Sequence, residues 1–185
     1  MEKTVNLDSG SIWIYDDMFS YAWRDNFYNK VVSSKYTTLG LDNEFPEQLM
    51  YRSIFAPKNY HDAEEMGWWD SKGWNTVKHH FDGMDIKQIR INLSTLNDYN
   101  RIHSDGINTK TLIYYPNMEW DVTWGGHTFF TNEDATEIEF SLAYKPGRLI
   151  LFDGGIPHCI GAPTVAASGY RYSFVIQFFG NSDNE

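Results

Sequence analysis

Two stretches of this chain place a histidine and an aspartate one residue apart, at positions 80–82 and 103–105. Residues i and i+2 of an extended segment project to the same side, so each pair could present an imidazole and a carboxylate to one metal ion. Non-haem iron oxygenases bind Fe(II) with two imidazoles and one carboxylate on one face, which leaves the other coordination positions open. With 6 histidines and 15 aspartates in 185 residues, chance alone gives about half a His-x-Asp match. The surrounding sequence therefore has to decide which of the two pairs is the better candidate for a metal site.

The context favours the pair at 103–105. His80 lies in a polar stretch, which is typical of an ordinary surface position. His103 and Asp105 instead lie in a turn between two predicted strands, where a rigid sheet presents functional residues. We therefore expect His103 and Asp105 to be metal ligands.

A third ligand has to come from another segment, and His158 is the candidate. It follows an apolar stretch and lies beside Gly154, Gly155 and Pro157, as a ligand at the end of a strand would. Taken alone, such a histidine is more often a hydrogen-bonded core residue than a ligand. Its position after the strand favours the ligand role, and we predict that His158 completes the site.

From residue 86 onward, strand patterns alternate with turns. Ile138, Phe140 and Leu142 alternate with polar residues, which indicates a sheet with one solvated face. Residues 145–148 (Lys-Pro-Gly-Arg) are a turn signal, because proline fixes φ and glycine tolerates a positive φ. The predicted strands are residues 86–96, 111–115, 126–131, 137–143, 148–152 and 170–179.

The first 85 residues have a less regular pattern. Residues 11–15 indicate a short strand, and Ser20 suits the N-cap of a helix over 21–30. Residues 37–82 are interrupted by prolines and glycines and predict short helices and loops. This segment and the loop at 97–102 are expected to form a lid that selects the substrate.

Helices followed by six to eight strands indicate a mainly β fold with flanking helices: a double-stranded β-helix, or jelly roll, with a cupin-like barrel. A chain of 185 residues suits one domain, and its 42% hydrophobic residues can fill one core. We expect a single domain over 1–185, with helical and lid elements in 1–85 and the jelly-roll core in 86–180.

Composition excludes several classes of partner. The net charge of −10 and a pI near 4.9 disfavour binding to nucleic acid, which needs clustered cations. Cys159 is the only cysteine, so no intramolecular disulfide can form. The start lacks a basic and apolar secretion signal, and no apolar run reaches the roughly 18 residues of a membrane span. These features predict no membrane partner and a cytoplasmic protein.

Several motifs occur in the order found in the prolyl 4-hydroxylase-like branch of the 2-oxoglutarate oxygenases, over roughly residues 86–179. After the His-x-Asp turn, residues 113–117 (Ile-Tyr-Tyr-Pro-Asn) resemble the strand that follows in that family, and 120–126 resemble its loop ending in Trp-Gly-Gly. Residues 146–152 (Pro-Gly-Arg-Leu-Ile-Leu-Phe) are similar to the strand before the distal histidine, and 171–173 (Arg-Tyr-Ser) to the closing strand. The ordered set carries the resemblance, since each motif alone is common.

The resemblance implies a dioxygenase that uses Fe(II), O2 and 2-oxoglutarate as co-substrate, with ascorbate as an optional reductant. Such an enzyme hydroxylates an unactivated C–H bond and releases succinate and CO2. By this resemblance, His103, Asp105 and His158 hold iron, and peptidyl proline is the expected substrate.

The resemblance also implies a site for the co-substrate. Arg171 and Ser173 share one face of their strand, and a buried guanidinium needs an anion as its partner. The distal carboxylate of 2-oxoglutarate is that anion. Tyr115, Ile113 and Thr111 share a face of another strand, from which Tyr115 could donate its hydroxyl to the same carboxylate. The alternative for Arg171 is a structural salt bridge or a surface position.

Some positions depart from the family pattern. Leu93 stands where the family often has a tyrosine, and His127 where it often has glutamate. The residue six after Arg171 is Gln177, whereas oxygenases that demethylate nucleobases have a second arginine there. Two alternatives remain open: a non-catalytic, cupin-like protein that binds a metal or small molecule, and an oxygenase acting on a free amino acid or sugar.

Overall fold

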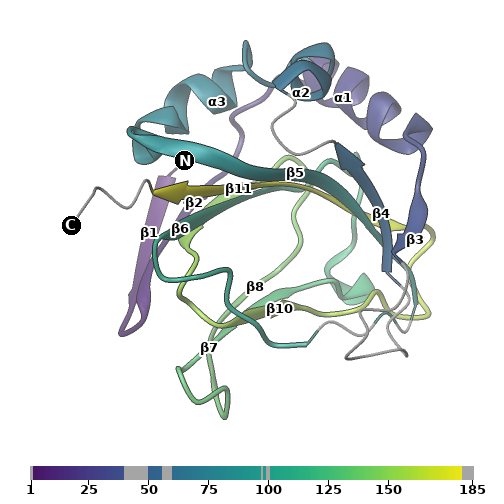
Figure 1. Ribbon diagram of the computed structural model, residues 1–185. Coiled ribbons are helices and arrows are strands. Elements are labelled where there is room, and N and C mark those ends of the chain that lie inside the picture. Colours follow the sequence, from purple (N-terminus) through teal and green to yellow (C-terminus); the bar gives the residue numbers. More distant parts are fainter. Residues whose placement is uncertain (1, 40–49, 56–59, 97, 99–100, 181–185) are drawn as a thin grey trace.

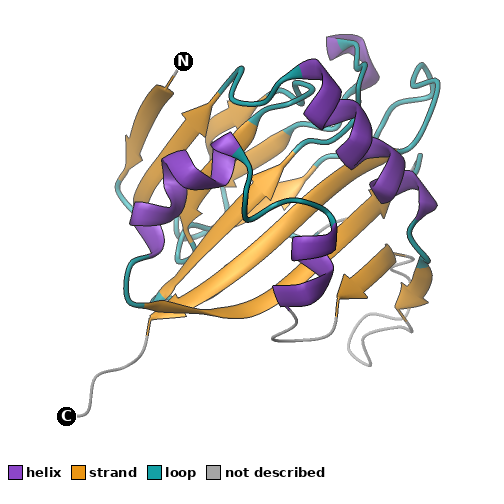
Figure 2. Ribbon diagram, turned by 90° about the horizontal axis from the view of Figure 1, so that it is seen from above, coloured by secondary structure: helices purple, strands orange, loops and turns teal. Residues whose placement is uncertain are grey.

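The computed structural model describes residues 2–39, 50–55, 60–96, 98 and 101–180. Two β-sheets lie face to face, and helices cover the outer face of the larger sheet (Figures 1 and 2). The chain therefore has the predicted mainly β jelly-roll fold with flanking helices.

Among the described residues, the larger sheet has eight strands in the order β1-β2-β9-β6-β11-β5-β4-β3, and each neighbouring pair is antiparallel. Its strands are β1 (Glu2–Leu7), β2 (Gly10–Tyr15), β3 (Thr37–Leu39), β4 (Met50–Phe55), β5 (Met84–Ser94), β6 (Thr109–Tyr114), β9 (Leu149–Asp153) and β11 (Arg171–Gly180). The smaller sheet has the order β10-β7-β8, with β7 (Thr128–Thr131), β8 (Ile138–Leu142) and β10 (His158–Ile160).

The helices pack on the larger sheet. They are α1 (Tyr21–Ser33), α2 (Tyr60–Glu65), α3 (Lys72–Val77), and the 3-10 turns η1 (Lys78–Phe81) and η2 (Val122–Trp124), of which η2 lies apart in a loop. The Ser20 hydroxyl accepts a hydrogen bond from the Trp23 amide at 3.3 Å, which confirms the predicted N-cap. Phe27 and Val31 of α1 are fully buried against the sheet.

Strand β11 separates two cores. Its residues Tyr172, Phe174, Ile176 and Phe178 belong to a cluster shared with the helices, whereas Val175 belongs to the cluster between the two sheets. Successive side chains of a strand point to opposite faces, so Arg171, Ser173 and Gln177 also face the space between the sheets. The polar residues of β11 thus lie inside the barrel.

The prediction that residues 37–82 contribute to a lid over the site is wrong for residues 60–81. Trp68, Val77 and Phe81 pack in the same cluster as Phe174 and Phe178, on the outer face of the larger sheet. This places α2 and α3 on the face of the larger sheet that points away from β7, β8 and β10 (Figure 1). Residues 40–49, 56–59, 97 and 99–100 lie outside the described residues.

The strands predicted from residue 86 onward are confirmed, with shifts of a few residues at their ends. The prediction of helices and loops for 37–82 is wrong at β3 and β4, because these segments pair with each other and, through β4, with β5. The pattern also missed β1, a mostly exposed edge strand, and β10, which has three residues. No helix in the described ranges has the length and apolar character needed to cross a lipid bilayer.

Candidate metal centre and co-substrate pocket

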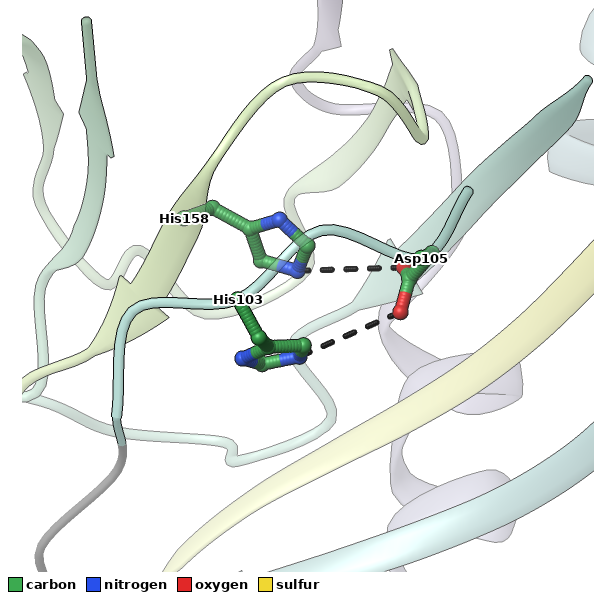
Figure 3. A group of neighbouring side chains, drawn as sticks. All are labelled: His103, Asp105 and His158. Atoms are coloured by element: carbon green, nitrogen blue, oxygen red, sulfur yellow. Dashed lines mark ion pairs between the residues drawn. The ribbon is translucent and has the colours of Figure 1, made fainter. Parts of the chain in front are cut away.

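The structure brings the three predicted ligands together. One possible ligand atom from each of His103, Asp105 and His158 lies within 4.8 Å of the other two. The Asp105 carboxylate faces both imidazoles from one side, with its Oδ1 3.9 Å from His103 Nε2 and its Oδ2 3.8 Å from His158 Nε2 (Figure 3). The Asp105 and His158 side chains are each 5% exposed, whereas that of His103 is 50% exposed, so the cluster opens to solvent on the His103 side.

Backbone hydrogen bonds hold the turn at 103–106 against the end of β9. The amides of Asp105 and Gly106 both donate to the carbonyl of Gly154, at 2.8 and 3.2 Å. The Gly154 amide in turn donates to the carbonyl of Thr109 at 2.8 Å. Asp105 is therefore positioned by the sheet and not by a free loop.

Both imidazoles have their Nε2 atom available for a metal. His103 Nδ1 lies 2.9 Å from the carbonyl oxygen of Arg101, and His158 Nδ1 lies 2.9 Å from that of Ile156. A carbonyl oxygen only accepts, so each Nδ1 donates, and in the neutral ring this arrangement leaves the lone pair on Nε2. In each case the acceptor is the residue two positions before the histidine.

His158 is held in its neutral form. Burial and, secondly, the neighbouring His103 lower the pKa of His158 to about 4. A metal binds the neutral imidazole, so His158 does not need to lose a proton before binding at neutral pH.

Asp105 is held as a carboxylate. Burial alone would raise the pKa of Asp105, but the interaction with His158 and a hydrogen bond from the Thr111 hydroxyl outweigh it and lower the pKa. Gln177 Nε2 donates to the other carboxylate oxygen at 2.5 Å. Thr111, which we expected to contact the co-substrate, thus contacts the metal-ligand candidate in this structure.

Arg171 lies inside the barrel with 0% exposure. Its Nε donates to the Gly126 carbonyl at 2.9 Å, and its guanidinium carbon lies 5.2 and 4.9 Å from the ring centroids of Tyr115 and Tyr144. Within the described chain, Nη1 and Nη2 have no hydrogen-bond partner. Burial lowers the pKa of Arg171, whereas Tyr115 and Tyr144 oppose this shift.

Unsatisfied buried polar atoms are costly, and two more of those among the described residues lie at facing positions of β11 and β5, close to Arg171 along β11. The Ser173 hydroxyl is buried and has no hydrogen-bond partner in the part of the chain that the structure describes, and the same holds for Oδ1 of Asn92, which pairs with Ser173 across β11 and β5. Two guanidinium nitrogens and one hydroxyl fit a carboxylate, which accepts hydrogen bonds through both oxygens. The donor set therefore fits one end of a dicarboxylic acid such as 2-oxoglutarate.

The other two predicted co-substrate residues lie on the barrel wall. Tyr115 is fully buried, and its hydroxyl lies 2.6 Å from the Thr128 hydroxyl. Burial raises the pKa of Tyr115, so it stays protonated and remains a donor. Ile113 packs in the apolar cluster between the sheets.

The sequence reasoning missed Asn92, Thr128 and Gln177. Gln177 was detectable as a polar residue within the otherwise apolar stretch 174–179, because such a position is buried when the strand is central. Asn92 lies among several polar residues of β5 and carried no such signal. Thr128 carried no comparable signal, since threonine is common in strands.

The second His-x-Asp pair does not join the site. His80 is half-buried, with Nε2 2.9 Å from the Tyr15 hydroxyl and its ring 4.8 Å from that of Trp13. The prediction of an ordinary surface role is wrong in this respect, because η1 packs against β2. Asp82 is exposed at the end of η1.

Solved structures of 2-oxoglutarate oxygenases share the fold of this chain. Neither the scan against protein families nor the search of curated proteins finds a match for this sequence.

Three solved structures illustrate the similarity. A prolyl hydroxylase from Trichoplax adhaerens, in complex with a peptide of hypoxia-inducible factor, has a TM-score of 0.67 and 13% identity, covering 91% of this chain and 83% of that one. A prolyl 4-hydroxylase from Pseudomonas putida has a TM-score of 0.62 and 14% identity, covering 91% and 92%. HygX from Streptomyces hygroscopicus, with nickel, 2-oxoglutarate and hygromycin B bound, has a TM-score of 0.69 and 8% identity, covering 95% and 85%.

Proposed function

We propose that this protein is an Fe(II)- and 2-oxoglutarate-dependent dioxygenase. The observation that carries the proposal is Arg171, a fully buried guanidinium with two nitrogens unpartnered in the described chain, inside the barrel that holds the His-Asp-His cluster. A buried cation is costly without an anion, so Arg171 requires an anionic partner. Two neutral imidazoles and one carboxylate are the donor set of Fe(II) oxygenases.

Each side chain has a defined part in this proposal. His103, Asp105 and His158 would hold the iron, and Arg171 with Ser173 would bind the distal carboxylate of 2-oxoglutarate. Iron, 2-oxoglutarate and O2 together supply the oxidant that replaces a C–H hydrogen with hydroxyl, while 2-oxoglutarate becomes succinate and CO2. Ile113 and Val175 belong to the apolar cluster between the two sheets, so the wall around Arg171 and Ser173 is partly apolar.

The test measures succinate in the presence of Fe(II), O2 and 2-oxoglutarate, first without substrate. We expect slow conversion of 2-oxoglutarate that stops when iron is removed by a chelator and returns when Fe(II) is added. A cupin-like protein that only binds a metal or small molecule would give no succinate at all. Tight binding of 2-oxoglutarate without turnover would support that alternative.

We propose peptidyl proline as the substrate. The peptide complex of the Trichoplax enzyme and the motif order of residues 103–173 support a peptide. HygX, a fold relative that was solved with hygromycin B, supports the alternative of a small molecule such as a sugar or free amino acid. Mass spectrometry for a +16 Da product in a library of proline-containing peptides, run beside a panel of amino acids and sugars, distinguishes these substrates.

A further inference from the structure

Gln177 and Thr111 hold opposite oxygens of Asp105. The two residues are paired directly across β11 and β6. Gln177 Nε2 donates to Asp105 Oδ1 at 2.5 Å, and the Thr111 hydroxyl donates to Oδ2. Both donors are almost fully buried, at 5% and 1% exposure. Because strand register fixes their separation, the carboxylate plane is fixed as well.

Arg90 determines which way the Gln177 amide points. Arg90 Nη1 donates to Gln177 Oε1 at 3.2 Å and to Gln88 Oε1 at 2.6 Å. A guanidinium has donors only, so the amide atom that faces it must be the oxygen. The Gln177 NH2 group must then face Asp105. Arg90 and Gln88 lie on β5, and Gln177 pairs with Gln88 in register.

The chemistry of these contacts suits a metal ligand. A carboxylate has about four lone-pair sites, and one hydrogen bond at each oxygen leaves sites free for a metal ion. Thr111 and Gln177 are uncharged, so they orient Asp105 without forming an ion pair that would compete with the metal for its charge. An arginine at 177 would form such an ion pair.

We propose that Gln177 is a positioning residue, which orients Asp105 for metal binding, and that Arg90 acts on Asp105 by fixing the Gln177 amide. The inference rests on the proposed metal site. It assigns a role to the polar residue that β11 places six positions after Arg171. The competing explanation is that Gln177 only satisfies its own buried amide and contributes to stability alone.

The first test compares Gln177→Met with Gln88→Met. Both changes replace a β-strand glutamine that accepts from Arg90, but only Gln177 contacts Asp105, so Gln88→Met is the matched control. Metal-free protein is titrated with Mn(II) by calorimetry, without activity as the readout. We expect a roughly 10- to 100-fold weaker affinity for Gln177→Met and wild-type affinity for Gln88→Met. Equal affinities for the wild type and Gln177→Met overturn the inference.

The second test is a double-mutant cycle with Arg90→Met. If Arg90 acts through the amide, the double variant binds Mn(II) no more weakly than Gln177→Met alone. Additive losses mean that Arg90 acts through its own charge and overturn its proposed role. If Gln177→Met does not fold, Gln177→Asn withdraws the donor from Asp105 while keeping an amide, and the same loss of affinity is expected.

The proposed metal site and the proposed role of Gln177 are refuted by different results. A wild-type protein that binds no Mn(II), Co(II) or Fe(II) refutes the metal site and the dioxygenase with it. A wild-type protein that binds metal, together with a Gln177→Asn variant that binds equally well, refutes only the role of Gln177. In the Fe(II) and 2-oxoglutarate complex, the charge-transfer absorption band should shift in Gln177→Met and stay unchanged in Gln88→Met.

Discussion

The main chains of His103 and His158 are hydrogen-bonded to each other in both directions. His103 N donates to His158 O at 3.0 Å, and His158 N donates to His103 O at 2.9 Å, which forms an isolated antiparallel bridge. The imidazole ring centroids lie 4.6 Å apart. Backbone geometry thus sets the spacing of the two imidazoles.

Replacing His103 or Asp105 by Ala should abolish conversion of 2-oxoglutarate to succinate. Each variant leaves two of three proposed ligands, and Asp105→Ala also removes the negative charge that offsets the metal. Succinate formation measured by NMR checks this. His79→Ala, at an exposed histidine, serves as the control and should keep wild-type turnover. Normal turnover in both site variants would contradict the metal assignment.

Arg171→Met should have opposite effects on binding and on stability. The affinity for 2-oxoglutarate should fall by about 3 kcal/mol or more, because the variant leaves a buried carboxylate without its cation. The free energy of unfolding without ligand should stay equal or rise, since a buried charge is replaced by an apolar side chain. Calorimetry and urea denaturation measure the two quantities. Unchanged affinity would show that another residue binds the distal carboxylate.

Gly154→Ala should weaken both metal binding and stability. A Cβ at Gly154 would lie 1.9 Å from Thr109 Oγ1 and 3.1 Å from the Thr109 carbonyl, so the strand end that holds Asp105 has to move. We expect a loss of about 1–3 kcal/mol in the free energy of unfolding. At Gly155 the nearest atom to a Cβ is 3.9 Å away, so Gly155→Ala is the matched control and should lose much less. Equal losses would mean that the contact at Thr109 relaxes freely.

Arg148, in the Pro-Gly-Arg turn, should stabilise the fold in a pH-dependent way. Its Nε and Nη2 donate to the two oxygens of Asp16 at 2.8 and 2.9 Å, and these hydrogen bonds lower the pKa of Asp16. A lowered pKa in the folded state gives stability that is present above the unfolded pKa of about 4 and is lost as the pH falls further.

The variant Asp16→Asn tests this contribution. It should cost about 1 kcal/mol of unfolding free energy at pH 7, since the pair is partly exposed. Urea denaturation at pH 7 and pH 3 should show the difference from wild type shrinking at the lower pH. A difference that stays constant between the two pH values would mean that the charge of Asp16 does not contribute.

The sequence determined the features that depend on neighbouring residues. The alternation of apolar residues identified most strands from residue 86 onward, and Ser20 marked the start of α1, because both signals are local. The order of short motifs indicated the fold and selected His103, Asp105, His158 and Arg171. The structure brings the three ligand candidates to one cluster.

Only the tertiary structure decided the features that depend on distant segments. Strands β1, β3, β4 and β10 exist because of their partners, and their own patterns are weak. Register and burial likewise decide the pairing of Gln177 with Thr111 and the His103–His158 bridge. They also leave two nitrogens of Arg171 without a hydrogen-bond partner among the described residues. Hydrogen bonds between remote backbones set these relationships, and no local pattern of residue types encodes which strands will meet.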